Sequence, residues 1–311
     1  TPDNNGAVPF WQAMWPGQGF TPQDAPLVLG ELGMERPGPG LVPPSDDAEL
    51  RREWMLLLID QRGHQELAAA LRQQPDALGD YYGVDQEHGL WRDFKNAPAL
   101  WEVVKQANDD VFSWSAYVGQ PWTAAQIPSL AKWGAENEER LNLLREAGAR
   151  PEFYSPSPSL LGNGDKALFA MLLAIQDMRS AVRMLSLRAY FFMGNSEYEE
   201  AWQDLLACYR LSDHIAGKAS LVQELVSTAC KGIADATTLA LLERPDLPPE
   251  LAREILNEFD GRPPRNHAAA ATDQTERLCF LDAVIRMSQG GLHEFDDELP
   301  ADAMRRGVNW N

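Results

Sequence analysis

The spacing of apolar residues between positions 165 and 211 predicts two long helices joined by a short turn. In the first of them, apolar residues recur every three or four positions and therefore share one helical face. That face is formed by Leu168, Met171, Leu172, Ile175, Met178, Val182, Leu185, Ala189 and Phe192. Further apolar residues widen it to much of the circumference, so we expect a central helix that is covered on several sides.

The turn between the two helices is predicted at Gly194-Asn195-Ser196. Glycine and asparagine tolerate the left-handed conformation that ends many helices. Ser196 can then cap the next helix, and Glu199 three residues later would complete a capping box. Two helices joined by so short a loop run antiparallel. The sequence therefore predicts an all-α protein whose antiparallel helical hairpins form an array or bundle.

Further helices are predicted on both sides of this hairpin, and the sequence shows no alternation typical of strands. In one of them, Thr228, Gly232 and Ala236 lie on or near one face, where small side chains permit close helix packing. The predicted ranges are 46–71 with an interruption at Gly63, a helix that starts at 96, the region from Ser129 to Gly148, 219–242, 248–260 and 267–288.

Proline and glycine mark the predicted boundaries between the parts of the chain. Residues 1–45 are rich in both and carry aromatic residues that a flexible linker would lack, which favours an extended N-terminal arm strapped over a helical body. The Pro/Ser/Gly-rich stretch 151–164 predicts a linker loop. It would separate an N-terminal helical part, 46–150, from a C-terminal helical-hairpin part, 165–311.

The predicted hairpin also resembles one unit of a tetratricopeptide repeat, whose period is about 34 residues. The residues that carry this resemblance are Ala189, Tyr198, Ala201 and Leu205, followed by Cys208 where a small residue is usual. The match covers one unit. A generic helical hairpin explains the same residues equally well.

A second resemblance extends over nearly the whole chain. Besides the hairpin it rests on Asn5–Phe10, Glu136–Glu138, Arg150–Pro151, Glu276–Arg277 and Gly307–Asn311. In this order the segments resemble uncharacterised all-helical proteins common in planctomycete bacteria. The resemblance implies an extracytoplasmic or periplasmic body behind an N-terminal membrane segment, with no assigned catalytic residues, while a cytoplasmic location stays open. Because the chain begins at Thr1, we expect that any targeting or anchoring segment has been removed.

The charge of the chain narrows the classes of partner. With 27 basic and 46 acidic residues, its net charge is −19. A charge of this sign disfavours binding to a nucleic-acid backbone or to an anionic membrane surface. Interrupted apolar stretches also lead us to expect no membrane span in this chain, because a spanning helix needs about 18 apolar residues.

Neither a metal site nor a cofactor site is predicted. The five histidines show no spacing typical of zinc ligands. The acidic stretch His293–Glu298 lacks the glycine and ligand spacing of a calcium loop and is better explained as a solvated loop. Cys208, Cys230 and Cys279 are most simply buried small residues, although one disulfide stays open in an oxidising compartment.

One enzymatic alternative follows from aromatic and acidic residues. Eight of the ten tryptophans precede residue 134, and flat rings beside carboxylates can bind and hydrolyse a saccharide. Asp273, Glu276 and Asp282 are the candidate catalytic carboxylates of such a helical carbohydrate-active enzyme or glycan-binding protein. Buried pairing with arginines of the central helix, such as Arg188, explains these carboxylates more simply, and core packing explains the tryptophans.

The sequence therefore favours a non-catalytic binding or scaffold module of unknown oligomeric state. A groove between helices would recognise a protein or peptide. The candidate groove residues are Arg188, Tyr190, Tyr198 and Trp202, because arginine and large aromatic residues dominate binding energies at protein interfaces.

Overall fold

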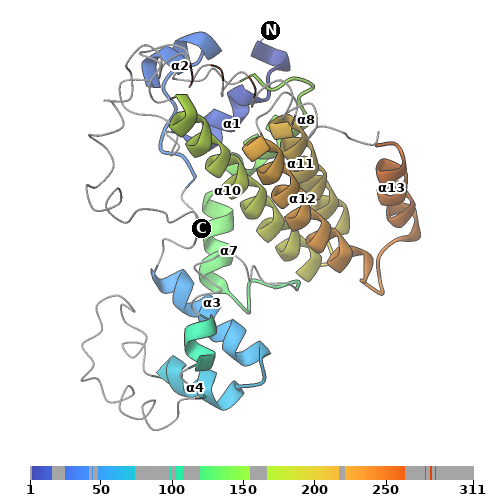
Figure 1. Ribbon diagram of the computed structural model, residues 1–311. Coiled ribbons are helices and arrows are strands. Elements are labelled where there is room, and N and C mark those ends of the chain that lie inside the picture. Colours follow the sequence, from blue (N-terminus) through green and yellow to red (C-terminus); the bar gives the residue numbers. More distant parts are fainter. Residues whose placement is uncertain are drawn as a thin grey trace, which may run out of the picture. The chain divides into compact units, whose positions relative to one another are not determined.

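The computed structural model describes residues 2–15, 25–41, 44, 48–73, 99, 102–107, 120–154, 167–216 and 221–262, together with 277, 281 and 284. These residues form helices, and the described ranges contain no β-strand; one isolated parallel bridge joins Asn5 to Glu152. The predicted all-α class is therefore confirmed. The helices are η1 (Pro2–Asn4), α1 (Ala7–Met14), α2 (Ala25–Leu32), α3 (Ala48–Gln61), α4 (Gln65–Gln73), α7 (Pro128–Glu136), α8 (Glu138–Ala149), α10 (Ala167–Gly194), α11 (Tyr198–Ala216), α12 (Leu221–Leu242) and α13 (Pro249–Asp260) (Figure 1).

The chain divides into two compact units. The first unit holds residues 1–215 and 226–262, and the second holds 216–225 and 263–311. The first unit thus continues across the predicted linker 151–164, of which residues 155–164 lie outside the described part of the chain. The division into 46–150 and 165–311 stays a prediction.

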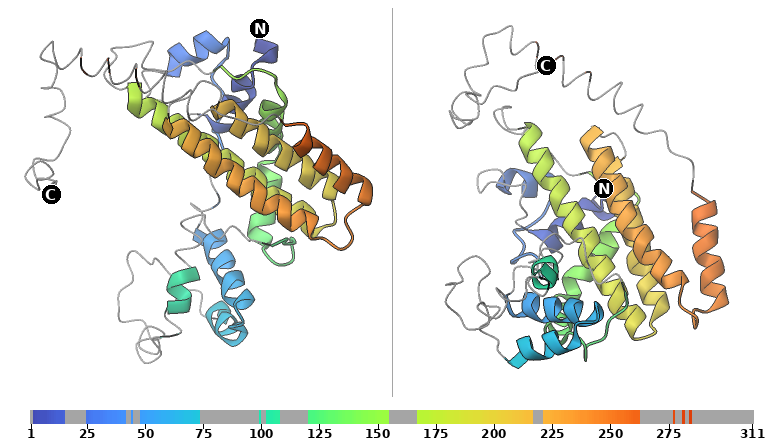
Figure 2. Two further views of the ribbon diagram at one scale, coloured as in Figure 1. Left: turned by 45° about the vertical axis from the view of Figure 1, so that its right-hand side comes forward. Right: turned by 60° about the horizontal axis from the view of Figure 1, so that its bottom comes forward.

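Helices α10 and α11 form the predicted hairpin, and α12 lies beside them in each of the views drawn (Figures 1 and 2). The described apolar face of α10 is buried as expected, from Met178 through Val182 and Leu185 to Ala189. On the neighbouring helices, the hydroxyl of Tyr209 in α11 donates to Asp235 of α12 at 2.7 Å. The hairpin and α12 therefore share one core.

The turn of the hairpin differs from the prediction. The residue with a left-handed backbone is Ser196, at φ 61°, and it lies two residues before α11 begins at Tyr198. It therefore does not form the predicted capping box; its hydroxyl oxygen lies 3.4 Å from the hydroxyl oxygen of Tyr198. Gly194 is required for another reason, because a Cβ there would lie 1.9 Å from the carbonyl oxygen of Trp122.

The N-terminal arm is not extended, and that prediction is wrong. Its described residues include helices α1 and α2. Helix α1 packs against α8, and its Phe10 and Trp11 are buried, because aromatic residues on one face of a short helix gain more by burial than by solvation. At Gly6 the backbone approaches α8 so closely that a Cβ would lie 2.4 Å from the carbonyl oxygen of Ala147. The aromatic residues thus hold the arm on the helical body, as expected, but in helical form.

Glycine also separates α3 from α4. Gly63 has a backbone φ of 85°, which a residue with a side chain rarely adopts. The predicted interruption of this helix at Gly63 is confirmed.

Candidate functional site

The four candidate groove residues lie in the core of the hairpin region. Their exposed fractions are 8% for Arg188, 4% for Tyr190, 3% for Tyr198 and 1% for Trp202. A partner in an open groove would not reach side chains buried to this degree. Their surroundings show instead what each of them does in the fold.

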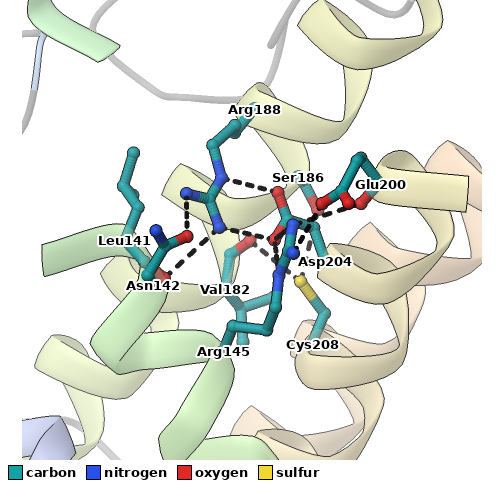
Figure 3. Close-up of polar contacts among 9 residues, drawn as sticks. All are labelled: Leu141, Asn142, Arg145, Val182, Ser186, Arg188, Glu200, Asp204 and Cys208. Atoms are coloured by element: carbon teal, nitrogen blue, oxygen red, sulfur yellow. Dashed lines mark hydrogen bonds and ion pairs between the residues drawn. The ribbon is translucent and has the colours of Figure 1, made fainter. Parts of the chain in front are cut away.

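Arg188 of α10 forms a two-point ion pair with Asp204 of α11. Its Nε donates to Asp204 Oδ2 and its Nη2 donates to Oδ1, both at 2.7 Å (Figure 3). Its Nη1 donates to Asn142 Oδ1 of α8 at 2.9 Å, and Nη2 also approaches the Leu141 carbonyl oxygen at 3.4 Å. Two parallel bonds from a guanidinium to a carboxylate are a strong and geometrically selective pairing. Arg188 therefore joins three helices.

Arg145 of α8 reaches the same carboxylate from another helix (Figure 3). Its Nε donates to Asp204 Oδ1 at 2.9 Å, and its Nη1 donates to Glu200 Oε2 at 2.7 Å. We call Asn142, Arg145, Arg188, Glu200 and Asp204 the Asp204 clamp. Two guanidinium groups and two carboxylates balance the charge of the clamp.

The chemistry of the Asp204 clamp is that of a structural joint. Asp204 is fully buried, yet three hydrogen bonds from two arginines satisfy its oxygens. Burial acts to lower the pKa of Arg145, but Asp204 and Glu200 outweigh this effect, so the pKa lies above its usual value. Removal of one partner from a buried pair leaves an uncompensated charge and costs about 3–5 kcal/mol. The clamp thus fixes α8, α10 and α11 to one another.

Two buried cysteines lie next to this region and behave as predicted. Cys208 and Cys230 are free thiols with no exposed surface. Burial raises the pKa of Cys230 to about 11 and raises that of Cys208 further. A thiol that stays protonated is a poor nucleophile and a poor metal ligand. Cys279 lies outside the described residues.

The other three candidate groove residues also have structural partners. The Tyr198 hydroxyl donates to Asp246 Oδ2 at 2.5 Å, which ties the start of α11 to the loop after α12. Burial raises the pKa of Tyr190. The ring of Trp202 lies 6.3 Å from that of Phe259 in α13, and its indole nitrogen has no hydrogen-bond partner among the described residues.

The residues of the enzymatic alternative are only partly described. Asp273, Glu276 and Asp282 lie outside the described residues, so their geometry stays a prediction. Arg188, one of their expected partners, is paired with Asp204 instead. The tryptophans that are fully buried or nearly so are Trp11, Trp15, Trp54, Trp122 and Trp202. For the four that precede residue 134, the expectation of core packing is confirmed, whereas Trp202 is the candidate groove residue described above.

Sequence reasoning missed the exposure of one face of α12. The face carries Val222, Leu225, Ala229, Gly232, Ala236 and Leu239, all of them exposed. Leu225 is 62% exposed and Leu239 is 60% exposed. The opposite face, with Cys230, Ala234 and Leu241, is buried. We call the exposed set the outward face of α12. Its small residues were expected to allow close helix packing, but no described side chain lies within 4 Å of a Cβ at Gly232.

Helix α12 also has the length of a membrane span. Among the described residues, it is the helix long and apolar enough to cross a membrane by length and composition alone. Lys231 and Asp235 interrupt its apolar run, and the sequence therefore did not predict a membrane span there. A core helix of such length and composition would be mostly buried, whereas 33% of the most apolar stretch of α12 is buried. One helix of this kind is weak evidence for a membrane span.

Metal binding finds no support in the described part of the chain, which holds no group of three or more His, Cys, Asp and Glu residues that could hold a metal ion. Comparison with known proteins adds no further assignment: the chain matches no protein-family model, no curated protein and no solved structure.

Proposed function

We propose that this chain is a non-catalytic binding module that takes an amphipathic helix of a protein or peptide partner on the outward face of α12. One observation carries the proposal: six exposed residues of this face follow one another at spacings of three, four, three, four and three. Such spacing is the pattern of a helix that packs lengthwise against another helix. The proposal keeps the predicted scaffold function but moves its surface from the buried hairpin residues to α12.

The shape of the outward face supports a helical occupant. The face extends from Val222 to Leu239, which is about 27 Å at the rise of an α-helix. Large residues lie at its ends, and Ala229, Gly232 and Ala236 lie between them. Small residues in the middle allow the backbone of a second helix to come close, while leucine at either end gains by burial.

Charge indicates which helices would bind. The chain carries a net charge of −19, and exposed acidic side chains such as Asp235 and Glu243 flank or end the outward face. A partner helix with an apolar stripe and lysine or arginine beside it would be attracted to this surface. An acidic partner helix would be repelled.

The location of the chain belongs to the same proposal. An extracytoplasmic or periplasmic position rests on the resemblance to the planctomycete proteins alone. Fractionation of source cells with an antibody against the chain tests it. Recovery of the chain in the cytoplasmic fraction would contradict it.

A pair of designed peptides tests binding directly. The first is a helical 18-residue peptide of leucine and lysine with an apolar stripe, and the second has the same composition in an order without a stripe. We expect saturable binding of the striped peptide alone, measured by fluorescence anisotropy in about 0.15 M salt, where long-range charge attraction is screened.

Variants locate the binding surface. Gly232→Leu fills the middle of the outward face, and Leu239→Ser removes an apolar end, so each should weaken binding by about tenfold or more, about 1.4 kcal/mol. Tyr154→Ser is the matched control, since Tyr154 is an exposed aromatic residue that does not belong to the outward face. Equal binding by all three variants, or equal binding of both peptides, would overturn the proposal.

A further inference from the structure

The N-terminal residues are joined to the segment after α8 by a set of hydrogen bonds. The Gly6 amide donates to the Glu152 carbonyl oxygen at 2.7 Å, and the Glu152 amide donates to that of Asn4 at 3.2 Å. The side chain of Asn5 exchanges two hydrogen bonds of 2.8 Å with the backbone of Tyr154. The guanidinium of Arg150 donates to the Asp3 carbonyl oxygen. We call residues 3–6 and 150–154 the N-terminal junction.

His214 in the last turn of α11 holds this junction from the other side. Its ring stacks on that of Phe153, with centroids 5.3 Å apart and an angle of 27° between the planes. Phe153 in turn meets the ring of Phe10 in α1 at 5.7 Å. The histidine is therefore part of the aromatic stack that seats α1.

The two nitrogens of the His214 ring have different surroundings. One forms a hydrogen bond with the backbone of Arg150. Nε2 is buried and has no hydrogen-bond partner among the described residues. The bond to Arg150 therefore comes from Nδ1, which as an N–H donates to the carbonyl oxygen. A second proton would have to bind at Nε2, where no acceptor from the described part of the chain faces it.

The charged groups near His214 do not compensate for such a proton. On α11, Asp213 favours it and Arg210 opposes it. Asp213 is already paired with Lys231 of α12 at 3.2 Å, and Arg150 at the end of α8 is paired with Glu146. Asp3 and Glu152 contribute backbone atoms to the junction. Burial lowers the pKa of His214, and this effect exceeds the opposing hydrogen bond and Asp213.

We propose that His214 is a pH-sensitive latch: its neutral ring holds the N-terminal junction on α11, and its protonation in mild acid releases residues 3–6 and α1. The charged ring leaves the stack with Phe153 so that Nε2 reaches water. The stack and the Arg150 bond are then lost together. The inference stands apart from binding at α12, because the N-terminal junction and the outward face share no residue.

The direction of the pH dependence follows from linkage. A histidine whose pKa is lowered in the closed form binds its proton more readily once released. The closed form is therefore fully favoured above the usual histidine value of about 6.5 and loses stability as the pH falls through that value. Each unit by which the closed form lowers the pKa corresponds to about a tenfold change in the closing equilibrium.

Hydrogen exchange on the full chain at pH 7.5 and 5.0, corrected for intrinsic exchange rates, tests the latch. We expect the protection of the Gly6, Glu152 and Tyr154 amides to fall by about tenfold for each unit of lowered pKa. The Glu197 amide, bonded to the Phe192 carbonyl oxygen in the hairpin turn, should keep its protection. No difference between the two pH values at the junction amides would overturn the proposal.

Variants assign the effect to this histidine. His214→Phe keeps an aromatic ring against Phe153 but cannot be protonated, so its junction should show no pH response. His64→Gln, between α3 and α4, is the control and should respond as the wild type does. A response that persists in His214→Phe would overturn the proposal. If His214→Phe does not fold, NMR titration of the wild type decides: the His214 ring and the Gly6 amide must change with one midpoint below about 6.5, and separate midpoints contradict the latch.

Discussion

The Asp204 clamp and the outward face of α12 reverse the usual distribution of polar and apolar groups. In the clamp, the guanidinium of Arg188 and the carboxylate of Asp204 lie inside the protein, and Asp204 has no exposed surface. On the outward face, leucine, valine, alanine and glycine are exposed along the length of a helix. Proteins bury charges only when they are paired, and extended apolar stripes on a surface often mark interaction sites.

The clamp and the outward face differ in how far their side chains are already in contact with other parts of the protein. The clamp contains arginine and carboxylates, residue types common in active sites, but its hydrogen-bonding groups are used by one another. The outward face contains no reactive group, but its apolar surface is left uncovered by the described helices. The Asp204 clamp is structural because its polar groups already have hydrogen-bond partners, whereas the outward face of α12 is a candidate binding region because its side chains are exposed.

Removal of the shared carboxylate should have the largest effect. Asp204→Ala leaves the buried Arg188 without its counter-ion and takes from the partly exposed Arg145 one of its two carboxylate partners. We therefore expect a loss of about 3–5 kcal/mol in the free energy of unfolding. Urea denaturation followed by circular dichroism measures it. Glu200→Gln is the matched control, because the side chain of Glu200 is 53% exposed and its pairing should contribute under about 1 kcal/mol. Equal losses in both variants would show that the clamp does not act through the buried charge.

Replacement of leucine by alanine should destabilise the chain strongly in the core and very little on the outward face of α12. Leu205→Ala in α11 opens a cavity in the core, since Leu205 is fully buried, and should cost about 2–5 kcal/mol. Leu239→Ala on the outward face should change stability by less than about 0.5 kcal/mol. Thermal unfolding of the two variants side by side checks the contrast. A large loss in Leu239→Ala would mean that another part of the chain covers the outward face.

Gly194 and Gly232 differ in the space that an added Cβ atom would meet. Gly194→Ala forces the carbonyl oxygen of Trp122 away from α10 and should cost about 1–3 kcal/mol. Gly232→Ala meets open space in the middle of a helix and should stabilise the chain by about 0.5–1 kcal/mol. Chemical denaturation of both variants gives the sign of each change. Stabilisation by Gly194→Ala would contradict the close approach of Trp122.

The smallest effect is expected at Tyr198. Its hydrogen bond lowers the pKa of Asp246, so this contribution to stability is present above the usual carboxyl value of about 3.8 and is lost as the pH falls below it. In Tyr198→Phe the pKa of Asp246 should rise towards that value, and unfolding should depend less on pH in this acidic range. NMR titration of the Asp246 carboxyl group measures the shift. If the titration midpoint of Asp246 is unchanged in Tyr198→Phe, the hydrogen bond from Tyr198 does not cause the lowered pKa of Asp246.

The sequence predicted those parts of the fold that depend on local spacing. The helix predicted at 219–242 is observed at Leu221–Leu242, and the one predicted at 248–260 is observed at Pro249–Asp260. Apolar spacing of three and four residues determines where such helices form. The N-terminal arm was mispredicted because proline and glycine suggested extended chain, whereas burial of Phe10 and Trp11 against α8 favours a helix.

The candidate site was less predictable because it depends on distant residues. Arg188 was expected to pair with the carboxylates of Asp273, Glu276 or Asp282, but it pairs with Asp204. Asp204 could not be chosen among 46 acidic residues without the register of α10 against α11. Arg145 is a further 43 residues before Arg188 in sequence and joins the clamp only through the packing of α8. The exposure of the outward face of α12 could not be predicted either. Apolar spacing shows that residues share a helix face, but it does not show whether another part of the protein covers that face.

The central claim is that a partner helix binds on the outward face of α12. Two-dimensional amide NMR of the chain with the leucine and lysine peptide shows which residues the bound peptide contacts. We expect the largest changes in amide chemical shift at residues 222–239 and no changes at residues 141–145, which include part of the Asp204 clamp. Shifts centred on α8 and the clamp, with residues 222–239 unchanged, would contradict it.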